Sequence, residues 1–145
     1  MITIEREVTV AATPDRVFDY LADFETTMEW DPGTITTTRL TGDGGVGTTY
    51  RNLSRFAGRE TELRYTVEQH DRPHRIVLRG ENRTVLARDT MTFTAHAHLT
   101  HVTYRAEFTF KGLARLAEPF LRKPFDKLGN DAEEGLRNAL GGLVS

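Results

Sequence analysis

The stretch from Thr34 to Lys111 constrains the fold most strongly, because it reads as successive strands with no helical pattern between them. Turn-forming residues interrupt it at Gly42-Asp43-Gly44-Gly45, Ala57-Gly58-Arg59, Asp71-Arg72-Pro73, Asn82-Arg83 and Leu99-Thr100. Strands that follow one another through short turns, without a crossover helix, pair as antiparallel hairpins. The stretch therefore predicts six antiparallel strands.

Another strand precedes this stretch. From Ile2 to Val10 apolar and polar residues alternate, which is the period of a half-buried strand. Thr13-Pro14-Asp15 then favours a helix start, since threonine can cap a helix and proline suits its first position. Asp23 can cap a second short helix, which Trp30-Asp31-Pro32 would end.

A helical period replaces the strand period at Gly112, and apolar residues then recur every three to four positions up to Leu143. This pattern predicts a long amphipathic helix, kinked or broken near Pro119 and Pro124. No linker or repeat is visible. We therefore expect a single α+β domain over residues 1–145, in which a curved antiparallel sheet of about seven strands wraps around the C-terminal helix.

The hairpins also predict which side chains face inward, because a two-residue turn fixes the residues opposite one another. Two-residue turns at three of the breaks would pair Met91 with Phe108, Asp89 with Phe110, Ile76 with Asp89, and Tyr50 with Val67. In all three hairpins the apolar residues then share one face. The other face collects charged residues that should meet water, namely Arg51, Arg55, Glu62, Arg64, Arg79, Arg88, Arg105 and Glu107.

A broad apolar face covered by one helix leaves two alternatives open. Helix and aromatic side chains fill the space completely, or a ligand pocket remains near the open end. The inward-facing set, together with Trp30 at the helix-to-strand corner and Phe120 in the final helix, gives the candidate ligand-binding residues. They are Trp30, Tyr50, Asn52, Leu63, Tyr65, Leu78, Asp89, Met91, Phe93, Tyr104, Phe108 and Phe120.

Composition excludes several classes of function. The net charge is −2 with interspersed signs, which gives no footprint for nucleic acid. The absence of cysteine excludes disulfides, thiol catalysis and cysteine-ligated metals. No apolar run approaches the ~20 residues of a membrane helix, and Met1 leads directly into a strand pattern. We expect a cytoplasmic protein, monomeric or homodimeric, without stable membrane insertion.

Asp89 is the strongest candidate for a chemical role. On the inner face, desolvation would raise its pKa, and a neutral acid there could donate a hydrogen bond to a ligand carbonyl or act as a general acid or base. Alternatively it lies at the sheet rim, where it reaches solvent or pairs with an arginine. The tyrosines Tyr50, Tyr65 and Tyr104 could orient a polar group of a mostly apolar guest.

Two other patterns resemble functional motifs only superficially. His96, His98 and His101 suggest a metal cluster, but the hairpin places them on the outer face without a carboxylate among them, so no metal or cofactor is expected. The glycines of residues 42–47 suggest a phosphate loop, yet a strand follows where a helix start is needed.

The chain resembles the START-like superfamily, also called the SRPBCC or helix-grip fold, over essentially its whole length. The resemblance lies in the order of elements and in four local motifs, namely Thr13–Asp23 followed by Trp30-Asp31-Pro32, Gly45-Val46-Gly47-Thr48, Gly58-Arg59, and Gly112-Leu113 with Glu118-Pro119. It is closest to bacterial members labelled polyketide cyclase/dehydrase. Two features depart from the pattern: the turn His98-Leu99-Thr100-His101, and the second helix breaker at Pro124.

The resemblance implies a cavity but no particular reaction. Our first hypothesis is a carrier or sensor for a small hydrophobic or amphipathic ligand, lipid-like or polyketide-like. The second is a polyketide aromatase/cyclase or dehydratase in which Asp89 or a tyrosine moves protons. The third is a module that binds a protein partner, as in the chaperone activators of this superfamily.

Overall fold

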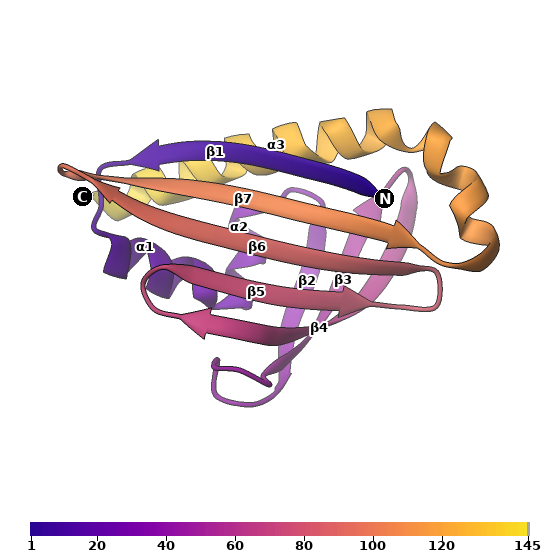
Figure 1. Ribbon diagram of the computed structural model, residues 1–145, viewed down its shortest axis with the longest axis horizontal. Helices are drawn as coiled ribbons and strands as arrows, with labels where there is room; N and C mark the ends of the chain where they lie inside the picture. The colour runs from indigo at the N-terminus through magenta and orange to yellow at the C-terminus, as the bar shows by residue number, and fades with distance from the viewer. Residues whose placement is uncertain (145) are drawn as a thin grey trace.

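A computed structural model describes residues 1–144 of the chain (Figure 1). Strands, α-helices and 3₁₀ helices (η) follow in the order β1 (Ile2–Val10), α1 (Pro14–Ala22), η1 (Phe24–Thr26), α2 (Thr27–Trp30), β2 (Thr34–Thr41), β3 (Thr49–Phe56), β4 (Arg59–Asp71), β5 (Arg75–Glu81), β6 (Val85–His96), β7 (Leu99–Phe110), η2 (Gly112–Phe120), α3 (Arg122–Gly141) and η3 (Gly142–Val144). The predicted order of elements is confirmed.

The seven strands form one antiparallel sheet in the order β1-β7-β6-β5-β4-β3-β2. β2 and β3 run at a steep angle to β7 and β1, so the sheet curls, and α3 lies along its concave side next to β1 (Figure 1). α1 and α2 close the same side below α3. The core lies between the sheet and these helices, as expected for a curved sheet wrapped around a C-terminal helix.

The short helices begin where the sequence predicts. The Thr13 side chain accepts a hydrogen bond from the backbone N–H of Arg16, and Pro14 occupies the first position of α1. Asp23 likewise accepts from the backbone N–H of Glu25 at the start of η1. Local capping chemistry therefore sets both helix starts.

The predicted residue pairings across the hairpins are wrong in detail. Met91 pairs with Tyr104 instead of Phe108, Tyr50 with Tyr65 instead of Val67, and Asp89 with Leu78 and Ala106 instead of Ile76 and Phe110. The β3–β4 turn is Ala57-Gly58, where both residues have positive φ, as the twist of a hairpin favours. The Asn82 side chain accepts from two backbone N–H groups and closes a longer β5–β6 turn.

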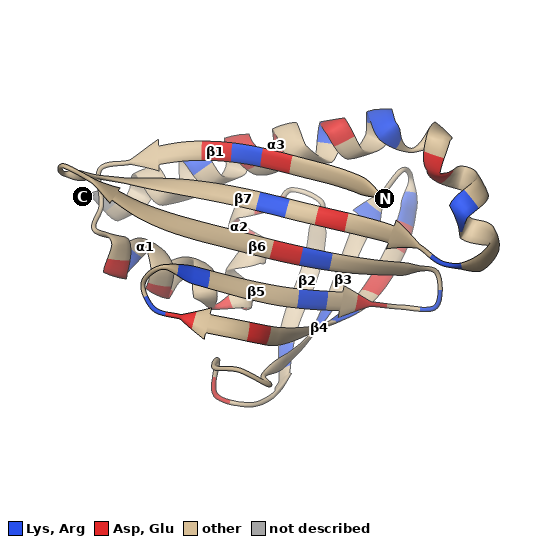
Figure 2. Cartoon of the chain, viewed as in Figure 1, with Lys and Arg blue, Asp and Glu red and all other residues tan. Residues whose placement is uncertain are grey.

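In each hairpin the observed register differs from the predicted one by an even number of residues, so every side chain stays on the predicted face of the sheet. The outer face carries the expected charges in ion pairs, such as Arg51 with Glu62 at 2.7 Å and Arg88 with Glu68 at 2.9 Å (Figure 2). These pairs are exposed and contribute little stability each. The outer face is therefore charged, as expected.

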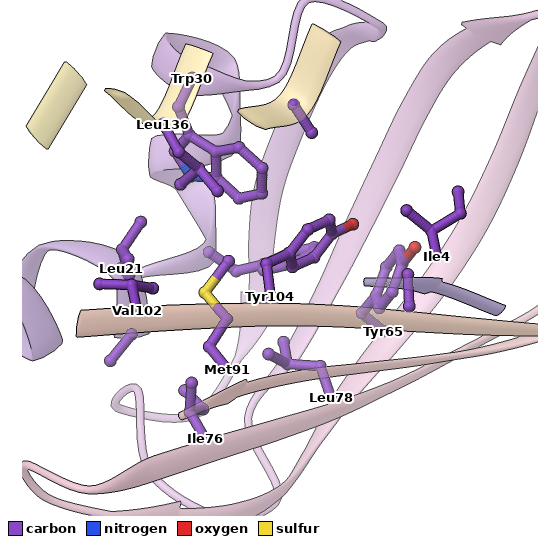
Figure 3. Close-up of a cluster of buried hydrophobic side chains, with 14 of the residues drawn as sticks. Ile4, Leu21, Trp30, Tyr65, Ile76, Leu78, Met91, Val102, Tyr104 and Leu136 are labelled. Atoms are coloured by element: carbon purple, nitrogen blue, oxygen red, sulfur yellow. The ribbon is translucent and has the colours of Figure 1, made fainter. Parts of the chain in front are cut away.

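Aromatic and aliphatic side chains from every layer meet in the core (Figure 3). Phe18 of α1 contacts Phe93 of β6 edge to face, with ring centroids 5.3 Å apart. Trp30 of α2 contacts Tyr104 of β7 in the same way at 5.7 Å. These contacts place α1 and α2 against the middle of the sheet.

Two glycines let α3 approach its neighbours closely. A Cβ on Gly135 would lie 1.7 Å from the backbone oxygen of Trp30, and one on Gly129 would lie 2.5 Å from a methyl group of Ile4. Any larger residue at either position would push the helix away from α2 or β1. The seating of α3 therefore depends on these two positions.

The C-terminal helical segment is broken near Pro119, as predicted, whereas the break predicted at Pro124 is wrong. η2 contains Pro119 and ends before Leu121, and α3 starts afresh at Arg122. Pro124 lies in the first turn of α3, where a backbone N–H has no partner within the helix, so it breaks nothing. Within the described chain, no helix has both the length and the apolar composition needed to cross a membrane.

Candidate functional site

A cavity of about 500 Å³ lies between the sheet, α2, η2 and the start of α3. This volume is within the range of roughly 300–1,000 Å³ that small-molecule sites occupy. Its walls are mostly apolar, with a few polar side chains. The lining residues are Phe24, Thr27, Trp30, Asp31, Gly33, Asn52, Ser54, Arg55, Phe56, Ala57, Arg59, Thr61, Leu63, Tyr65, Thr84, Val85, Asp89, Tyr104, Phe108, Phe110, Ala117, Leu121, Phe125 and Leu128.

The deep end of the cavity is formed by buried side chains. Trp30, Leu63, Tyr65 and Tyr104 line the cavity, and each is no more than 6% exposed. Trp30 and Tyr104 face each other from α2 and β7 (Figure 3). A guest would meet a largely aromatic wall here.

The mouth lies at the other end, where the lining residues are exposed. These come from the β3–β4 turn (Ala57, Arg59), the β5–β6 turn (Thr84) and η2 (Ala117), with Leu121 half-buried at the junction with α3. The break between η2 and α3 therefore forms one rim of the opening.

Asp89 of β6 is buried in the cavity wall, only 7% exposed, and its Oδ1 has no hydrogen-bond partner within residues 1–144. Burial, and secondarily the Asp31 carboxyl group, raise its pKa to about 7. The structure thus contradicts a position at the sheet rim, and among the described ion pairs none joins Asp89 to an arginine. At neutral pH this carboxyl group can both donate and accept a proton.

Asp31 is the second acid of the cavity. Burial raises its pKa, while hydrogen bonds from the Gly33 N–H and the Thr34 hydroxyl, both 3.0 Å long, partly offset that shift. Its oxygens are therefore engaged in shaping the turn into β2. Asp31 acts mainly by placing negative charge near Asp89, which favours the protonated form of Asp89.

The Trp30 indole is the other unsatisfied polar group. Its Nε1–H is buried and has no acceptor in the part of the chain that the structure describes. A buried donor without a partner costs about 1–3 kcal/mol. A guest with an acceptor that reached this atom would satisfy it.

The tyrosines Tyr65 and Tyr104 stay protonated over the physiological range. Burial, and then the negative charge of Asp89, raise the pKa of each well above the usual 10. Both hydroxyl groups can therefore donate hydrogen bonds. Tyr65 is held in place by its ring, which lies over Gly80 so closely that a Cβ there would be 2.5 Å from it.

Asn52 is already engaged by the protein. Its Nδ2 donates to the Thr37 hydroxyl at 2.8 Å, and that oxygen lies 2.6 Å from the hydroxyl oxygen of Thr27. This buried chain links β3, β2 and α2. Asn52 therefore fixes one wall of the cavity and has less hydrogen-bonding capacity left for a guest.

Seven of the predicted ligand-binding residues line the cavity: Trp30, Asn52, Leu63, Tyr65, Asp89, Tyr104 and Phe108. The other five do not. Tyr50, Leu78, Met91 and Phe93 are buried in the packed core, and Phe120 is 81% exposed on η2. Contact of any of these residues with a ligand remains a prediction.

Sequence reasoning missed several lining residues. Phe110 continues the inward alternation of Phe108 along β7, and Phe125 and Leu128 belong to the apolar stripe of α3, so periodicity could have found them. Asp31 gave no comparable signal, because nothing in the local pattern shows that the chain after α2 turns toward the cavity.

The histidines lie away from this site. His101 of β7 lies 3.0 Å from the Thr9 hydroxyl and 3.6 Å from a Glu7 carboxylate oxygen, on the outer face. Within the described residues, no three histidine or acidic side chains gather closely enough to hold a metal ion. The cavity itself offers two carboxyl groups.

The comparisons with known proteins agree with this arrangement. The sequence model of a family described as "Polyketide cyclase / dehydrase and lipid transport" matches residues 1–143. No curated protein sequence matches the chain significantly.

Solved structures match over nearly the full length. The Zhui aromatase/cyclase from a Streptomyces species superposes with a TM-score of 0.83 at 19% identity, covering 99% of this chain and 96% of that one. A START superfamily protein from Mycobacterium smegmatis gives 0.80 at 14% identity, with 97% and 98% covered. A protein from Thermus thermophilus gives 0.79 at 19% identity, with 99% and 97% covered. At these identities the likeness shows a shared fold.

Proposed function

Because the chain belongs to the polyketide cyclase/dehydrase and lipid transport family and has the START-like fold, we propose that it binds a small, largely apolar molecule with one uncharged polar end. It acts as a carrier or sensor for that molecule. The guest lies in the cavity between the sheet and the C-terminal helix, with its polar end against Trp30 and Asp89.

One observation carries this proposal: two buried polar atoms without partners, Trp30 Nε1 and Asp89 Oδ1, belong to residues of the same largely apolar cavity. Natural proteins rarely leave such atoms unsatisfied, because each costs free energy. A hydroxyl group can donate to Asp89 Oδ1 and accept from Trp30 Nε1, and a carbonyl group can accept from both when Asp89 is protonated. The apolar body of such a guest would remove the surrounding aromatic surface from water.

The charges in the buried part of the cavity favour an uncharged polar end there, whereas the two arginines of the lining, Arg55 and Arg59, are exposed. A carboxylate guest would meet Asp31 and Asp89, and would add a further negative charge to a desolvated site. An ammonium guest could pair with Asp31 or Asp89, but it would leave the Trp30 N–H without an acceptor and would itself have to be desolvated. A ketone or alcohol has neither problem, since it accepts from Trp30 and can accept from protonated Asp89.

The first test is native mass spectrometry of freshly purified protein, followed by extraction and identification of any bound molecule. We expect a discrete apolar guest with a carbonyl or hydroxyl group. A discrete guest bearing a carboxylate would contradict the proposed polarity of the cavity.

A second test compares three probes with one ring system: 2-acetonaphthone, 2-naphthoate and 2-naphthylmethylamine. We expect the ketone to bind the guest-free protein about tenfold or more tightly than either charged probe, measured by titration calorimetry. Equal affinity of the three probes, or no binding of the ketone, would overturn the proposal.

A pair of variants locates the binding. Thr61 of β4 lines the cavity, whereas Thr66 on the same strand does not. Thr61→Phe should abolish ketone binding by filling the cavity, and Thr66→Phe should leave it unchanged. Thermal melts of both variants confirm that each is folded. Ketone binding that survives Thr61→Phe would place the guest elsewhere.

A second candidate function is acid–base catalysis on a polyketide-like chain, and the position of Asp89 favours it. A carboxyl group with a pKa of about 7 inside a cavity is suited to move protons at neutral pH, beside two tyrosine hydroxyl groups that can donate hydrogen bonds. The test is turnover of a model poly-β-ketone. Turnover that Asp89→Asn abolishes and that depends on pH near 7 supports catalysis, and turnover unaffected by Asp89→Asn contradicts this role.

A further inference from the structure

The surface of η2 is unusually apolar for an exposed helix. Leu113 is 86% exposed, Leu116 73% and Phe120 81%. Isolated exposed apolar residues are common, but three large ones on one helix of nine residues form a patch of the kind that marks interaction sites. We call Leu113, Leu116 and Phe120 the η2 patch.

Two further apolar residues of this segment face the cavity. Ala117 lines the cavity mouth, and Leu121, directly after η2, lines it as well. A helix that is apolar all round is normally buried. One side of η2 covers the cavity, and the η2 patch has no cover within the described chain.

Positive charge lies next to the η2 patch. Arg122 and Lys123 follow it directly, are exposed, and form no ion pair in the part of the chain that the structure describes. They lie in the first turn of α3, where cations do not stabilise a helix, so helix stability does not explain them. Arg59, across the cavity mouth, is also exposed and has no ion pair within residues 1–144.

The acidic residue of η2 does not offset this charge. Glu118 forms an ion pair with the Met1 amino group at 2.9 Å, so its charge is balanced locally. In Figure 2, η2 and the start of α3 are mostly uncharged (tan) or basic (blue), and η2 has a single acidic (red) position. The mouth end of the molecule therefore combines exposed apolar side chains with unpaired cations.

We propose that the η2 patch docks on the surface of an anionic lipid bilayer. Leucine and phenylalanine side chains enter the headgroup boundary, and Arg122 and Lys123 lie against anionic headgroups, which is the pattern of interfacial binding segments. The contact is peripheral and reversible. It places the cavity mouth against the bilayer, so that an apolar guest can pass between the two without crossing water.

Cosedimentation with vesicles tests the proposal. The two vesicle compositions are pure phosphatidylcholine and phosphatidylcholine with about 30% phosphatidylglycerol, a fraction chosen to reproduce an anionic surface. We expect binding to the anionic vesicles that weakens as salt rises, and at least about tenfold weaker partitioning onto the neutral ones.

Variants of the η2 patch locate the contact. Leu113→Ser combined with Leu116→Ser and Phe120→Ser should reduce partitioning onto anionic vesicles by about tenfold or more, because three exposed side chains can no longer enter the boundary. The matched control is Val46→Ser, because Val46 is 68% exposed and belongs to the β2–β3 loop, which lies away from η2 in Figure 1. It should bind as the unchanged protein does.

A second variant tests the charges. Arg122→Gln with Lys123→Gln should reduce partitioning onto anionic vesicles by about tenfold and flatten its salt dependence. Both positions are exposed, so folding is preserved, and thermal melts verify this.

Three outcomes would overturn the proposal: no binding to anionic vesicles, equal binding to both compositions, or binding that the triple variant retains. A concentration-dependent dimer that the triple variant loses, without vesicle binding, would assign the η2 patch to a second copy of the chain instead. The vesicle assay uses protein without a guest. Its failure would therefore leave the ligand-binding proposal standing, and failure of the naphthyl probes would leave this one standing.

Discussion

Replacing Asp89 with asparagine separates the free energy of burying an ionised carboxyl group from that of burying a polar side chain of the same size. Asp89 is buried in the cavity wall, and its pKa rises from the ordinary 3.8 to about 7. At 1.36 kcal/mol for each pH unit, this difference corresponds to about 4 kcal/mol.

Proton binding determines whether the free energy of unfolding rises or falls with pH. Between about pH 4 and pH 7 the folded protein holds a proton on Asp89 that the unfolded chain has released. The free energy of unfolding therefore falls as pH rises through this window, by up to about 1.4 kcal/mol per pH unit from this residue. Below about pH 4 both states are protonated and above about pH 8 both are ionised, so the contribution is constant there.

Asp89→Asn removes the ionisable carboxyl group and keeps a side chain of nearly the same size and shape. At pH 4 the variant and the unchanged protein should have the same free energy of unfolding within about 1 kcal/mol, because both bury a neutral polar group. At pH 8 the variant should be more stable by about 3–4 kcal/mol, because the unchanged protein must bury a charge. For a domain of this size, that gain raises Tm by about 10 °C.

The assay is urea unfolding at pH values from 4 to 8, followed by fluorescence of Trp30, the only tryptophan. The matched control is Asp71→Asn, the same chemical change at an exposed residue at the end of β4. A difference between variant and unchanged protein that is the same at pH 4 and pH 8 would refute the reasoning. It would mean that Asp89 is ionised at little free-energy cost in the folded state.

Two further predictions concern the packing around the cavity. Gly135→Ala should lower the free energy of unfolding by about 2 kcal/mol or more, since its Cβ would lie 1.7 Å from the backbone oxygen of Trp30. The control is Gly141→Ala, which has open space around it and should be neutral or slightly stabilising in the same urea unfolding assay. Equal effects of the two would contradict the close seating of α3. Thr37→Val should cost about 1–3 kcal/mol by breaking the buried hydrogen bonds to α2 and β3, and the exposed Thr38→Val should change stability by less than about 0.5 kcal/mol. A Thr37→Val variant as stable as the unchanged protein would contradict the role of this network.

The fold could be predicted from the sequence because its signals are local and repeat many times. Alternation along β6 and β7 places Met91, Tyr104 and Phe108 inside and Arg105 outside. A change in turn length leaves these faces unchanged as long as the register shifts by an even number of residues. The actual pairings were predicted wrongly, because the turns lie at other residues than expected. The β3–β4 turn is Ala57-Gly58 and the β6–β7 turn is Ala97-His98, and hydropathy carries no information about the positive φ of Ala57, Gly58 and Ala97.

The inward position of Asp89 was likewise determined by the sequence, since its parity on β6 matches that of Met91 and Phe93. Its surroundings were not. Whether Asp89 meets solvent, an arginine or an enclosed cavity depends on how far the sheet curls and where η2 closes it, and the structure shows the enclosed cavity with Asp31 as a second acid.

The sequence by itself determined the order of the elements, the two faces of the sheet and the break in the C-terminal helix, because these depend on neighbouring residues and on periods of two and about four. Only the tertiary structure decided which inward-facing residues line the cavity and which are packed in the core. Tyr50 and Phe93 have the same pattern as Tyr65 and Tyr104, yet the first two are packed in the core and the last two line the cavity. The reason is that a cavity is what remains after distant elements have packed, so its walls depend on the curvature of the whole sheet and on the seating of α3, which no local stretch of residues encodes.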